Sequence, residues 1–596
     1  MSLIVQKFGG TSVADVGKIR DAARKAIRAQ RNGHRVVMVV SAMGKNTDRL
    51  LELADEVSPN PPAREMDMLL STGEQVSVAL VAMAITQLGS EAVSLTGGQI
   101  GMKTDSSFSK ARIQSISTER IERLLDQGKI VVAAGFQGID EDLNITTLGR
   151  GGSDTTAVAL AAVLKAEACE IYTDVDGVYT TDPRVLPEAR RVDVISYDEM
   201  LELASLGAGV MHSRSIEFAK KFGVPIHVRS SFSDTEGTMI VAGIESKESA
   251  VSGAALTPDE SRVTVLGVPD VPGKSLQIFS AIADRKIAVD MVVQNVGTDG
   301  RADVSFTVPG SELQDTLEAV NSVVKEIGAT GVTHDDNVSK VSVVGANMVR
   351  QSGVASKMFR ALADAGLNIQ LITTSEIKIS ALVSRDQASD ALRAVHQAFE
   401  LHKRPEDARS WQEIKAVREP GQDDNVAMIV SRLQDDALEA LTLTGISVTE
   451  GQARVTLFGV PDQPGIAADM FDTIGNAGIM VDMIVQGQDG QDGATSVSFT
   501  VQEESLDESL RIAKDLMKKH GMRDCQGAGG IAKVTVSGIG LRSHTSVATL
   551  LFQELASSEI NVEMIGTSEL QVNSVIDAKH AKTAMAGLEK VFAESL

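Results

Sequence analysis

The chain has 596 residues and a formal net charge of −23, with 43% hydrophobic and 23% charged residues. A single hydrophobic core stops growing at roughly 250–300 residues, so the length predicts two or more domains. The negative charge argues against nucleic acid and anionic membranes as partners, although local backbone N–H groups still allow an anionic substrate. The only two cysteines, Cys169 and Cys525, exclude a disulfide framework and a cysteine zinc site. We expect both to be buried structural thiols.

The sequence shows neither a membrane span nor a secretion signal. No apolar run approaches the roughly 20 residues that cross a bilayer. Gln6 and Lys7 interrupt the first apolar stretch, and no cleavage site follows it. We therefore expect a cytoplasmic protein, or an organellar one that has lost its transit peptide.

The first 245 residues alternate short apolar runs with helical patterns. The runs, which predict strands, are Leu3–Phe8, Arg35–Ser41, Lys129–Gly135 and Cys169–Thr173. The helical patterns are Val16–Gln30, Glu74–Leu88 and Thr155–Lys165. This alternation predicts an α/β domain over residues 1–245, with a mostly parallel sheet and helices on both of its faces.

The first predicted strand ends in the segment Lys7–Ser12 (KFGGTS), directly before a predicted helix. Glycines let backbone N–H groups approach a ligand, and a helix N-terminus adds partial positive charge. The lysine at the strand tip can reach an anionic oxygen, although in a Walker A loop the lysine follows the glycines. The segment is either a phosphate cradle or a plain strand–turn–helix corner.

Polar residues also follow the second predicted strand and open the next helix. Ser41 and Thr47 lie where ligands bind in open α/β sheets, beyond the carboxyl ends of the strands, although Thr47 also fits as a helix cap. Glu74 lies in the first turn of its predicted helix, where a carboxylate suits the helix dipole. The other interpretation of Glu74 is recognition of a substrate ammonium group.

The segment Leu148–Asp154 (LGRGGSD) precedes the predicted helix Thr155–Lys165. Arg150 offers a planar fork for a carboxylate or a phosphate. Ser153 or Asp154 fits as a helix cap, but capping does not explain an arginine between glycines. The segment therefore predicts anion recognition by Arg150.

A later strand leads into Tyr172–Tyr179 (YTDVDGVY) and on to Arg184. The aspartates of this segment lack the spacing of an EF-hand calcium loop. We interpret the segment as a nucleotide-binding loop, in which Asp174 holds Mg²⁺ or ATP groups, Tyr179 faces the base and Arg184 reaches a phosphate. The alternative is a turn with solvated aspartates.

The remainder of the chain is an internal repeat. Arg262–Asp270 returns as Arg454–Asp462, and Thr374–Glu376 returns as Thr567–Glu569. Each copy holds two units in which strands and helices follow the ferredoxin-like order βαββαβ. We expect the units at 260–330, 335–402, 451–525 and 530–596, with a linker and the start of the second copy at 403–450.

The segments Lys7–Ser12, Leu148–Asp154 and Tyr172–Tyr179, in this order, resemble those of the aspartate kinases of the amino acid kinase family. Residues 260–596 resemble ACT domains, which bind free amino acids as feedback signals. The resemblance implies a three-layer α/β/α kinase domain followed by four ACT domains. It also implies transfer of a phosphoryl group from ATP, with Mg²⁺, to L-aspartate, which gives 4-phospho-L-aspartate for lysine, threonine and methionine biosynthesis.

The same resemblance implies roles for individual residues. Lys7 would stabilise charge on the transferred phosphoryl group, and Asp154 would orient Lys7. Together with Lys7, the ATP-binding residues would be Gly9, Gly10, Ser12, Thr173, Asp174, Tyr179 and Arg184. The aspartate-binding residues would be Ser41, Thr47, Glu74, Arg150, Gly152 and Ser153. Some family members carry a nucleotide-contacting lysine where this chain has Gly209, so Gly209 receives no role, and His212 is expected to start a helix or lie in the core.

In the ACT half, the resemblance implies effector sites where two units meet edge to edge. In the first copy these residues would be Asp270, Gly273, Ser275 and Gln294, closed by Asn368 and Ile369, with Ser375. The second copy offers Asp462, Gly465, Ala467, Gln486, Asn561, Val562 and Ser568. Because Ser275 corresponds to Ala467, we expect the copies to differ in ligand or affinity. Lysine and threonine are the expected effectors.

We also expect the ACT units to pair within one chain, and the whole protein to form a homodimer. Two alternatives to an aspartate kinase remain. One is another member of the amino acid kinase family with a different acceptor, and the other is a non-catalytic amino-acid sensor. The presence of Lys7, Arg150 and Asp174 favours a working kinase.

Overall fold

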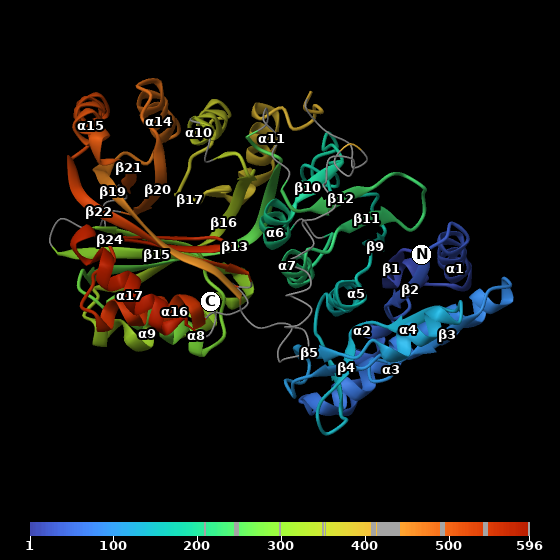
Figure 1. Cartoon of the computed structure of the whole chain (residues 1–596). Helices are drawn as coiled ribbons and strands as arrows, with labels where there is room; N and C mark the ends of the chain where they lie inside the picture. Colours follow the sequence, from blue (N-terminus) through green and yellow to red (C-terminus); the bar gives the residue numbers. More distant parts are fainter. Residues whose placement is uncertain are drawn as a thin grey trace.

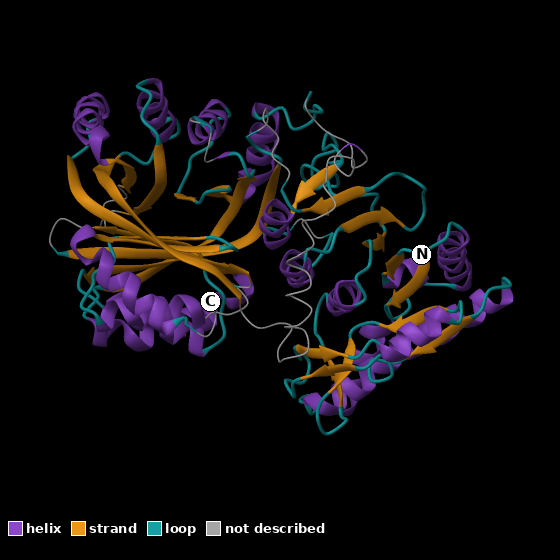
Figure 2. Ribbon diagram, in the orientation of Figure 1, coloured by secondary structure: helices purple, strands orange, loops and turns teal. Residues whose placement is uncertain are grey.

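The computed structural model describes residues 1–207, 210–243, 250–296, 300–348, 351, 353–406, 413, 442–488, 495–539, 541 and 546–593. The N-terminal part of the chain forms an α/β domain, and the C-terminal part forms a second body built on one long sheet (Figure 1). Figure 2 shows helices on both sides of that long sheet.

The N-terminal domain is built on a sheet whose described strands follow the order β10-β12-β11-β9-β1-β2-β6-β3. Neighbouring strands run parallel, except for the antiparallel pair β11 and β12. The strands are β1 (Leu3–Phe8), β2 (Arg35–Val40), β3 (Ala92–Leu95), β6 (Ile130–Ala134), β9 (Ala168–Thr173), β10 (Val194–Ser196), β11 (Ile226–Ser230) and β12 (Thr238–Val241). The structure contains all four strands predicted from the sequence, along with others that are shorter or carry more polar residues.

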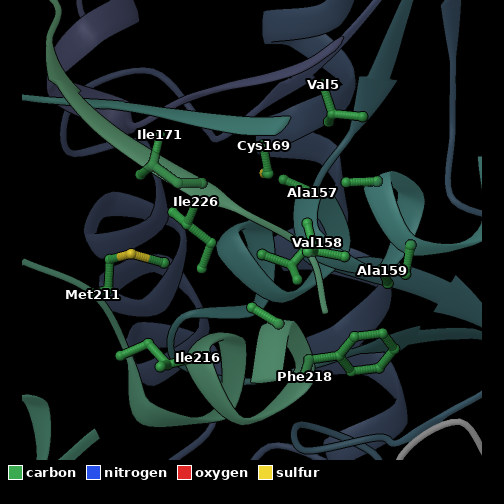
Figure 3. Packing of buried hydrophobic residues seen from close by; sticks show 14 of the residues in the cluster. Val5, Ala157, Val158, Ala159, Cys169, Ile171, Met211, Ile216, Phe218 and Ile226 are labelled. Carbon is green, nitrogen blue, oxygen red and sulfur yellow. The ribbon is translucent and has the colours of Figure 1, made fainter. Parts of the chain in front are cut away.

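Helices cover both faces of this sheet because successive strand residues point to opposite sides. On one face α1 (Val16–Arg31) and α3 (Ala63–Gln87) pack against Phe8 and Met38. On the other face α5 packs against Val5 and its neighbours, as Figure 3 shows around Val158 and Ile171. The helices that contribute to this second core are α4 (Glu119–Asp126), α5 (Gly152–Val163), α6 (Tyr197–Ser205) and α7 (Ser213–Phe222).

Helix α3 corrects two predictions from the sequence. It begins at Ala63, directly after Pro62, so Glu74 lies in the middle of the helix and not in its first turn. Gly73, directly before the predicted helix start, lies inside the helix and allows close packing, because a Cβ there would lie 2.8 Å from the Cβ of Ala42. By length and composition α3 is also apolar enough to cross a membrane, and half of its 18-residue apolar segment is buried in the protein. A core helix passes the same test, so this is weak evidence for a membrane span.

Two smaller features support the site. Helix α2 (Asn46–Val57) begins after Lys45, which occupies the cap position, so Thr47 lies in the first turn and is not the cap. A second small sheet has the order β5-β4-β7-β8 and leads into the Leu148–Asp154 segment. Its strands are β4 (Met102–Thr104), β5 (Ile113–Ile116), β7 (Gln137–Ile139) and β8 (Ile145–Thr147).

The C-terminal half has a sheet whose described strands follow the order β14-β15-β13-β16-β18-β17-β20-β21-β19-β22-β24-β23. The strands of the first copy are β13 (Gly253–Pro269), β14 (Asp290–Val296), β15 (Arg301–Pro309), β16 (Gly331–Val344), β17 (Leu371–Thr374) and β18 (Lys378–Ser384). Those of the second copy are β19 (Thr442–Val460), β20 (Val481–Gln488), β21 (Thr495–Gln502), β22 (Asp524–Ile539), β23 (Met564–Thr567) and β24 (Gln571–Asp577).

Four of these strands are long because each serves two units. In β13, residues 260–269 pair with β15, whereas residues 253–257 pair with residues 340–344 of β16. Residues 442–449 pair in the same way with residues 533–539 of β22. The second and fourth units therefore take one strand from upstream of the first and third units.

This arrangement overturns the expectation that every unit is continuous and ends in its own last strand. The part of the expected linker from 442 to 449 is a strand, and residues 407–412 and 414–441 lie outside the described residues. We name the units by their residues: unit 1 (262–337), unit 2 (253–257 and 338–398), unit 3 (452–531) and unit 4 (442–449 and 532–591). Their helices are α8 (Lys274–Asp284), α9 (Leu313–Ile327), α10 (Val354–Asp364), α11 (Ala388–Ala398), α14 (Ile466–Asn476), α15 (Leu506–His520), α16 (Ser546–Ser557) and α17 (Ala581–Val591).

Units from different copies pair with each other. The helices of units 1 and 4 share one core below the sheet, and those of units 2 and 3 share another above it (Figure 1). Edge strands β17 and β20 pair through Thr373 and Val485, and β14 lies against β23. Between the two layers, Met291, Leu371 and Met564 belong to one buried cluster. The expected pairing within one chain is present, and its partners are units 1 with 4 and 2 with 3.

Candidate functional site

Lys7 and Asp154 form an ion pair at the carboxyl edge of the N-terminal sheet. Lys7 lies near the end of β1, and Asp154 lies in the first turn of α5. The Lys7 Nζ is 2.5 Å from Asp154 Oδ1, and each side chain is 11% exposed. In open α/β sheets ligands bind at this edge, so the ammonium group is held where a ligand would arrive.

The segment Lys7–Ser12 at the end of β1 (the glycine loop) lies close to three other strand ends. A Cβ at Gly10 would stand 2.8 Å from the carbonyl oxygen of Ala42, so only glycine fits there without displacing the end of β2. The Gly9 N–H donates to the carbonyl of Tyr172 at the end of β9 (3.3 Å). The Ser231 hydroxyl, just beyond β11, donates to the Ser12 hydroxyl at 2.5 Å. Four strand ends thus form one floor.

Glu74 points its carboxylate at the end of β2. Its side chain is buried, and its Oε1 accepts the N–H of Ala42 at 3.0 Å. Burial raises the pKa of Glu74 to about 7, while the Ala42 hydrogen bond opposes that rise. The carboxyl group is therefore poised between its neutral and charged forms at neutral pH. Ser41 starts the same loop, donating its N–H to the carbonyl of Phe8.

The Leu148–Asp154 segment is anchored by two residues that the sequence reading missed. Asp67, fully buried in α3, accepts the Thr147 N–H and hydroxyl at 2.8 and 2.7 Å. Arg214 donates to the carbonyls of Leu148 and Ala111. These bonds fix the backbone just before Arg150, whose own position is exposed. The position of Arg214, two residues after His212 at a helix start, was a signal that could have identified it. Asp67 lies inside a helix, and the sequence around it carries no such signal.

The start of α5 differs from the predicted cap. Gly151, with φ of +71°, is the cap residue, so neither Ser153 nor Asp154 caps the helix. A Cβ at Gly151 would lie 2.3 Å from that of His212, which itself caps α7 by accepting the Arg214 N–H. His212 is thus a helix-start residue, as predicted. Ser153 is buried beside Gly135, and Gly152 packs under Phe136.

The predicted nucleotide loop follows β9 and is held by its own aspartates. The Thr173 hydroxyl donates to Asp174 at 3.1 Å. Tyr179 donates to Asp176 at 2.7 Å, while Arg184 pairs with Asp182 at 2.7 Å and is 85% exposed. The structure brings Thr173 and Asp174 to the strand edge beside the glycine loop. It leaves Arg184 on the surface, so a phosphate would have to replace Asp182 as its partner.

A cavity of about 490 Å³ lies beside the ion pair, between the N-terminal domain and unit 4. Gly151 and Asp154 line it on one side, and the end of α6 and the start of α7 line another. Glu569 of unit 4 also borders it. The C-terminal half therefore reaches the neighbourhood of Lys7 and Asp154.

The residues expected to bind effectors come together in a different combination from the one expected. Asn561 donates to Asp270 at 2.8 Å, and Gln294 donates to the carbonyl of Val562 at 2.9 Å, so unit 1 meets unit 4 here. Ser275 donates to Gln294 at 2.7 Å. The expected closure of this site by Asn368 and Ile369 is wrong, because the edge strands pair across the copies.

Those two residues close the other interface. Asn368 donates to Asp462 at 2.7 Å, and Gln486 donates to the carbonyl of Ile369 at 3.2 Å, so unit 2 meets unit 3. Gly465 and Ala467 line a small cavity with them. Gly273 and Gly465, both with positive φ, are the cap residues directly before α8 and α14, at equivalent places in the two interfaces.

Ser375 and Ser568 lie away from these two sets. Ser375 borders a different cavity, of about 290 Å³, together with Asp482 and Lys533. The Ser568 hydroxyl accepts the N–H of Gln571 at 3.1 Å within its own loop. The structure therefore does not bring either serine to the Asp270 or Asp462 clusters.

The raised pKa of Glu74 predicts a pH-dependent loss of stability without ligand. Because the folded state holds this proton more tightly, the contribution of Glu74 to the free energy of unfolding is complete below pH 4.5 and is lost as the pH rises to about 7. Glu74→Gln removes the titration, so the variant gains roughly 2–3 kcal/mol relative to wild type between pH 5 and pH 8. Urea unfolding at both pH values measures the difference. Glu65→Gln, at an exposed position of the same helix, is the control, and equal pH dependence of wild type and Glu74→Gln would contradict the assignment.

Both halves of the chain match known protein families. The sequence model of the amino acid kinase family matches residues 2–230, and that of the ACT domain matches residues 341–399, 455–515 and 534–592. The chain is 50% identical to the aspartokinase of Bacillus sp. (strain MGA3) over 402 residues, which are 67% of this chain and 98% of the relative. It is 49% identical to the aspartokinase of Thermus thermophilus over 405 residues, 68% of this chain and 100% of the relative.

Solved structures agree with these matches. The crystal structure of aspartate kinase from Synechocystis is similar over 100% of this chain and 98% of that one, with a TM-score of 0.53 and 38% identity. The structure of E. coli aspartokinase III in complex with lysine and aspartate covers 67% of this chain and 99% of that one, with a TM-score of 0.54 and 25% identity. The chain belongs to the aspartokinase family.

Proposed function

We propose that this aspartate kinase transfers the γ-phosphoryl group of ATP to the side-chain carboxylate of L-aspartate at the edge of the sheet around Lys7, within a three-layer α/β/α domain at residues 1–245. The ion pair of Lys7 with Asp154 carries this proposal. It holds a cation beside a glycine loop and below the Arg150 segment, where both a phosphate and a carboxylate can approach.

Phosphoryl transfer needs positioning and charge neutralisation more than covalent chemistry. Lys7 lies near the end of β1, where its ammonium group balances charge that builds on the transferred group. Asp154 keeps that ammonium group in place, and Gly9, Gly10 and Ser12 line the phosphate path. The attacking carboxylate of aspartate is ionised at pH 7, so the reaction needs no general base.

Aspartate would bind through both of its ends. Arg150 offers a planar fork to a carboxylate of the substrate, supported by Gly152 and Ser153. Glu74, with Ser41 and Thr47 beside it, would hold the substrate ammonium group. Because an approaching cation favours the charged form of Glu74, binding of aspartate would lower the raised pKa of this residue.

ATP would lie over the end of β9. Thr173 and Asp174 stand at that edge, while Tyr179 and Arg184 follow in the same loop. Asp174 is exposed, so its carboxylate is accessible to a metal–phosphate group. Mg²⁺ is usually bound by one or two carboxylates together with substrate phosphates. Bound Mg²⁺ would supply charge neutralisation of the phosphate oxygens.

The C-terminal half would be a sensor of four ACT units in two copies, at about 260–330, 335–402, 451–525 and 530–596, with the upstream strands described above. The paired interfaces would bind amino-acid effectors, with Asp270, Gln294 and Asn561 at one and Asp462, Gln486 and Asn368 at the other. The lysine bound to the E. coli relative supports lysine as one effector, and we propose threonine as the second.

We further propose that the protein is cytoplasmic and acts as a homodimer. The net charge of −23 favours solubility. Sedimentation equilibrium measures the assembly directly, and a monomer across the micromolar range would contradict the dimer.

Arg150 provides a direct test of substrate recognition. Arg150→Ala removes the fork that pairs with the substrate carboxylate, so kcat/KM for aspartate should fall on the order of 10²-fold or more. The hydroxamate assay for aspartyl phosphate, with MgATP and varied aspartate, measures it. Arg184→Ala is the control, with an expected rise in KM for ATP instead. Unchanged kcat/KM for aspartate in Arg150→Ala would contradict the proposed role.

The two interfaces can be separated by matched substitutions. Asp270→Asn and Asp462→Asn each remove the charge that would hold an effector ammonium group at one interface only. We expect each variant to raise the half-inhibitory concentration of one amino acid by about tenfold, corresponding to about 1.4 kcal/mol, and the two variants to affect different amino acids. Inhibition curves with lysine and with threonine measure this. Identical shifts for both amino acids in both variants would contradict two distinct sites.

A further inference from the structure

Two equivalent loops of the sensor meet beside the kinase domain. Thr374–Glu376 joins β17 to β18 in unit 2, and Thr567–Glu569 joins β23 to β24 in unit 4. Gln571, at the start of β24, donates its Nε2 to Glu376 Oε2 at 3.1 Å, so the loops contact each other. The repeat thus brings the same segment of both copies to one place.

A single buried carboxylate of the kinase domain joins both of these elements. Glu202, in α6, is fully buried, and its Oε2 lies 2.9 Å from the Nζ of Lys378 at the start of β18, which is 5% exposed. Its Oε1 accepts the backbone N–H of Glu569 at 3.0 Å. One oxygen of Glu202 is therefore bound by unit 2, and the other by unit 4.

The two copies differ at the position that makes this contact. Lys378 and Gln571 both begin the strand after their loop, and both follow its glutamate by two residues. The lysine pairs with Glu202 of the kinase domain, whereas the glutamine bonds to Glu376 inside the sensor. The ionic link to the kinase domain is thus a property of one copy and not of the repeated fold.

Glu202 lies close to the wall of the cavity beside Lys7 and Asp154. Ala204 and Ser205, at the end of the same helix, line this cavity, and so does Glu569. Leu570, the next residue of the unit 4 loop, packs against the core of the kinase domain. A shift of either loop would therefore displace the end of α6 and the cavity wall.

Because both charges are buried, the Glu202–Lys378 ion pair fixes the relative position of the two parts more than it stabilises their contact. Desolvation offsets most of the attraction in a buried ion pair, and well-packed apolar residues often stabilise as well. The pair does, however, impose one alignment, because a displaced Lys378 would leave the Glu202 carboxylate buried without its cation.

We propose that Glu202 is a positioning residue through which both effector interfaces act on the kinase site. This rests on the proposed function. Unit 2 belongs to the interface containing Asp462 and unit 4 to the interface containing Asp270, so each interface holds one oxygen of the same carboxylate. An effector that binds one loop arrangement more tightly than another shifts the equilibrium of α6.

The test separates this coupling from folding and from effector binding. Because Lys378→Met alone leaves an unpaired buried charge, the double variant Glu202→Gln/Lys378→Met is made beside it. We expect the double variant to stay folded, to bind lysine and threonine in calorimetry, and to keep its activity without effectors within about twofold. Its half-inhibitory concentration for lysine with threonine should rise by about 5- to 150-fold, the range of typical coupling between sites.

Gln571→Met is the matched control, because it changes the equivalent residue of the other copy without touching the kinase domain, and its inhibition should match wild type. Inhibition of the double variant within twofold of wild type would overturn the proposal. Loss of amino-acid binding in the double variant would overturn it too, since it would show a purely structural role. A wild-type protein that forms no aspartyl hydroxamate would instead refute the proposed function.

Discussion

An unpaired edge strand is the constraint on which the sensor half depends. Each of the four units has one edge strand that its own unit leaves unpaired on the outer side, namely β14, β17, β20 or β23, and such edges invite pairing with other chains. The duplication gives the chain four edges that satisfy one another: β17 pairs with β20, and β14 lies against β23. The contact of Asp270 with Asn561, that of Asp462 with Asn368, and the meeting of the two loops beside α6 accompany this pairing.

The kinase half depends on a different physical feature, the shared edge at which parallel strands end. Lys7, the glycine loop and the β9 loop follow neighbouring strands, so residues far apart in sequence form one floor. Asp154 closes it from α5, the helix that also carries the core around Val158. The C-terminal half contacts the kinase half at Glu202, and Leu570 packs against the core of the kinase domain.

Elements whose structure is determined by a local pattern could be predicted from the sequence. The strand Leu3–Phe8 has the predicted bounds because a buried apolar run ending in glycines permits little else. Contacts that depend on pairing between distant strands could not be predicted. The sequence near residues 253–257 does not indicate that they complete a unit whose other strands begin at 338. No local pattern predicts the contact between Asp270 and Asn561. The start of α3 was predicted eleven residues too late, at Glu74 and not at Ala63, because Gly73 lies inside the helix, where it allows close packing against Ala42.

The pairing of units within one chain can be tested by a disulfide across β17 and β20. Thr373 and Val485 face each other in this antiparallel pair, where opposite Cα atoms lie roughly 4.5–5.5 Å apart, within the reach of a disulfide. Thr373→Cys/Val485→Cys, in a Cys525→Ser background, is oxidised and run on denaturing gels without reductant. The structure predicts a cross-link inside single chains, seen as a monomer of altered mobility that reductant restores. A covalent dimer of two chains would contradict it.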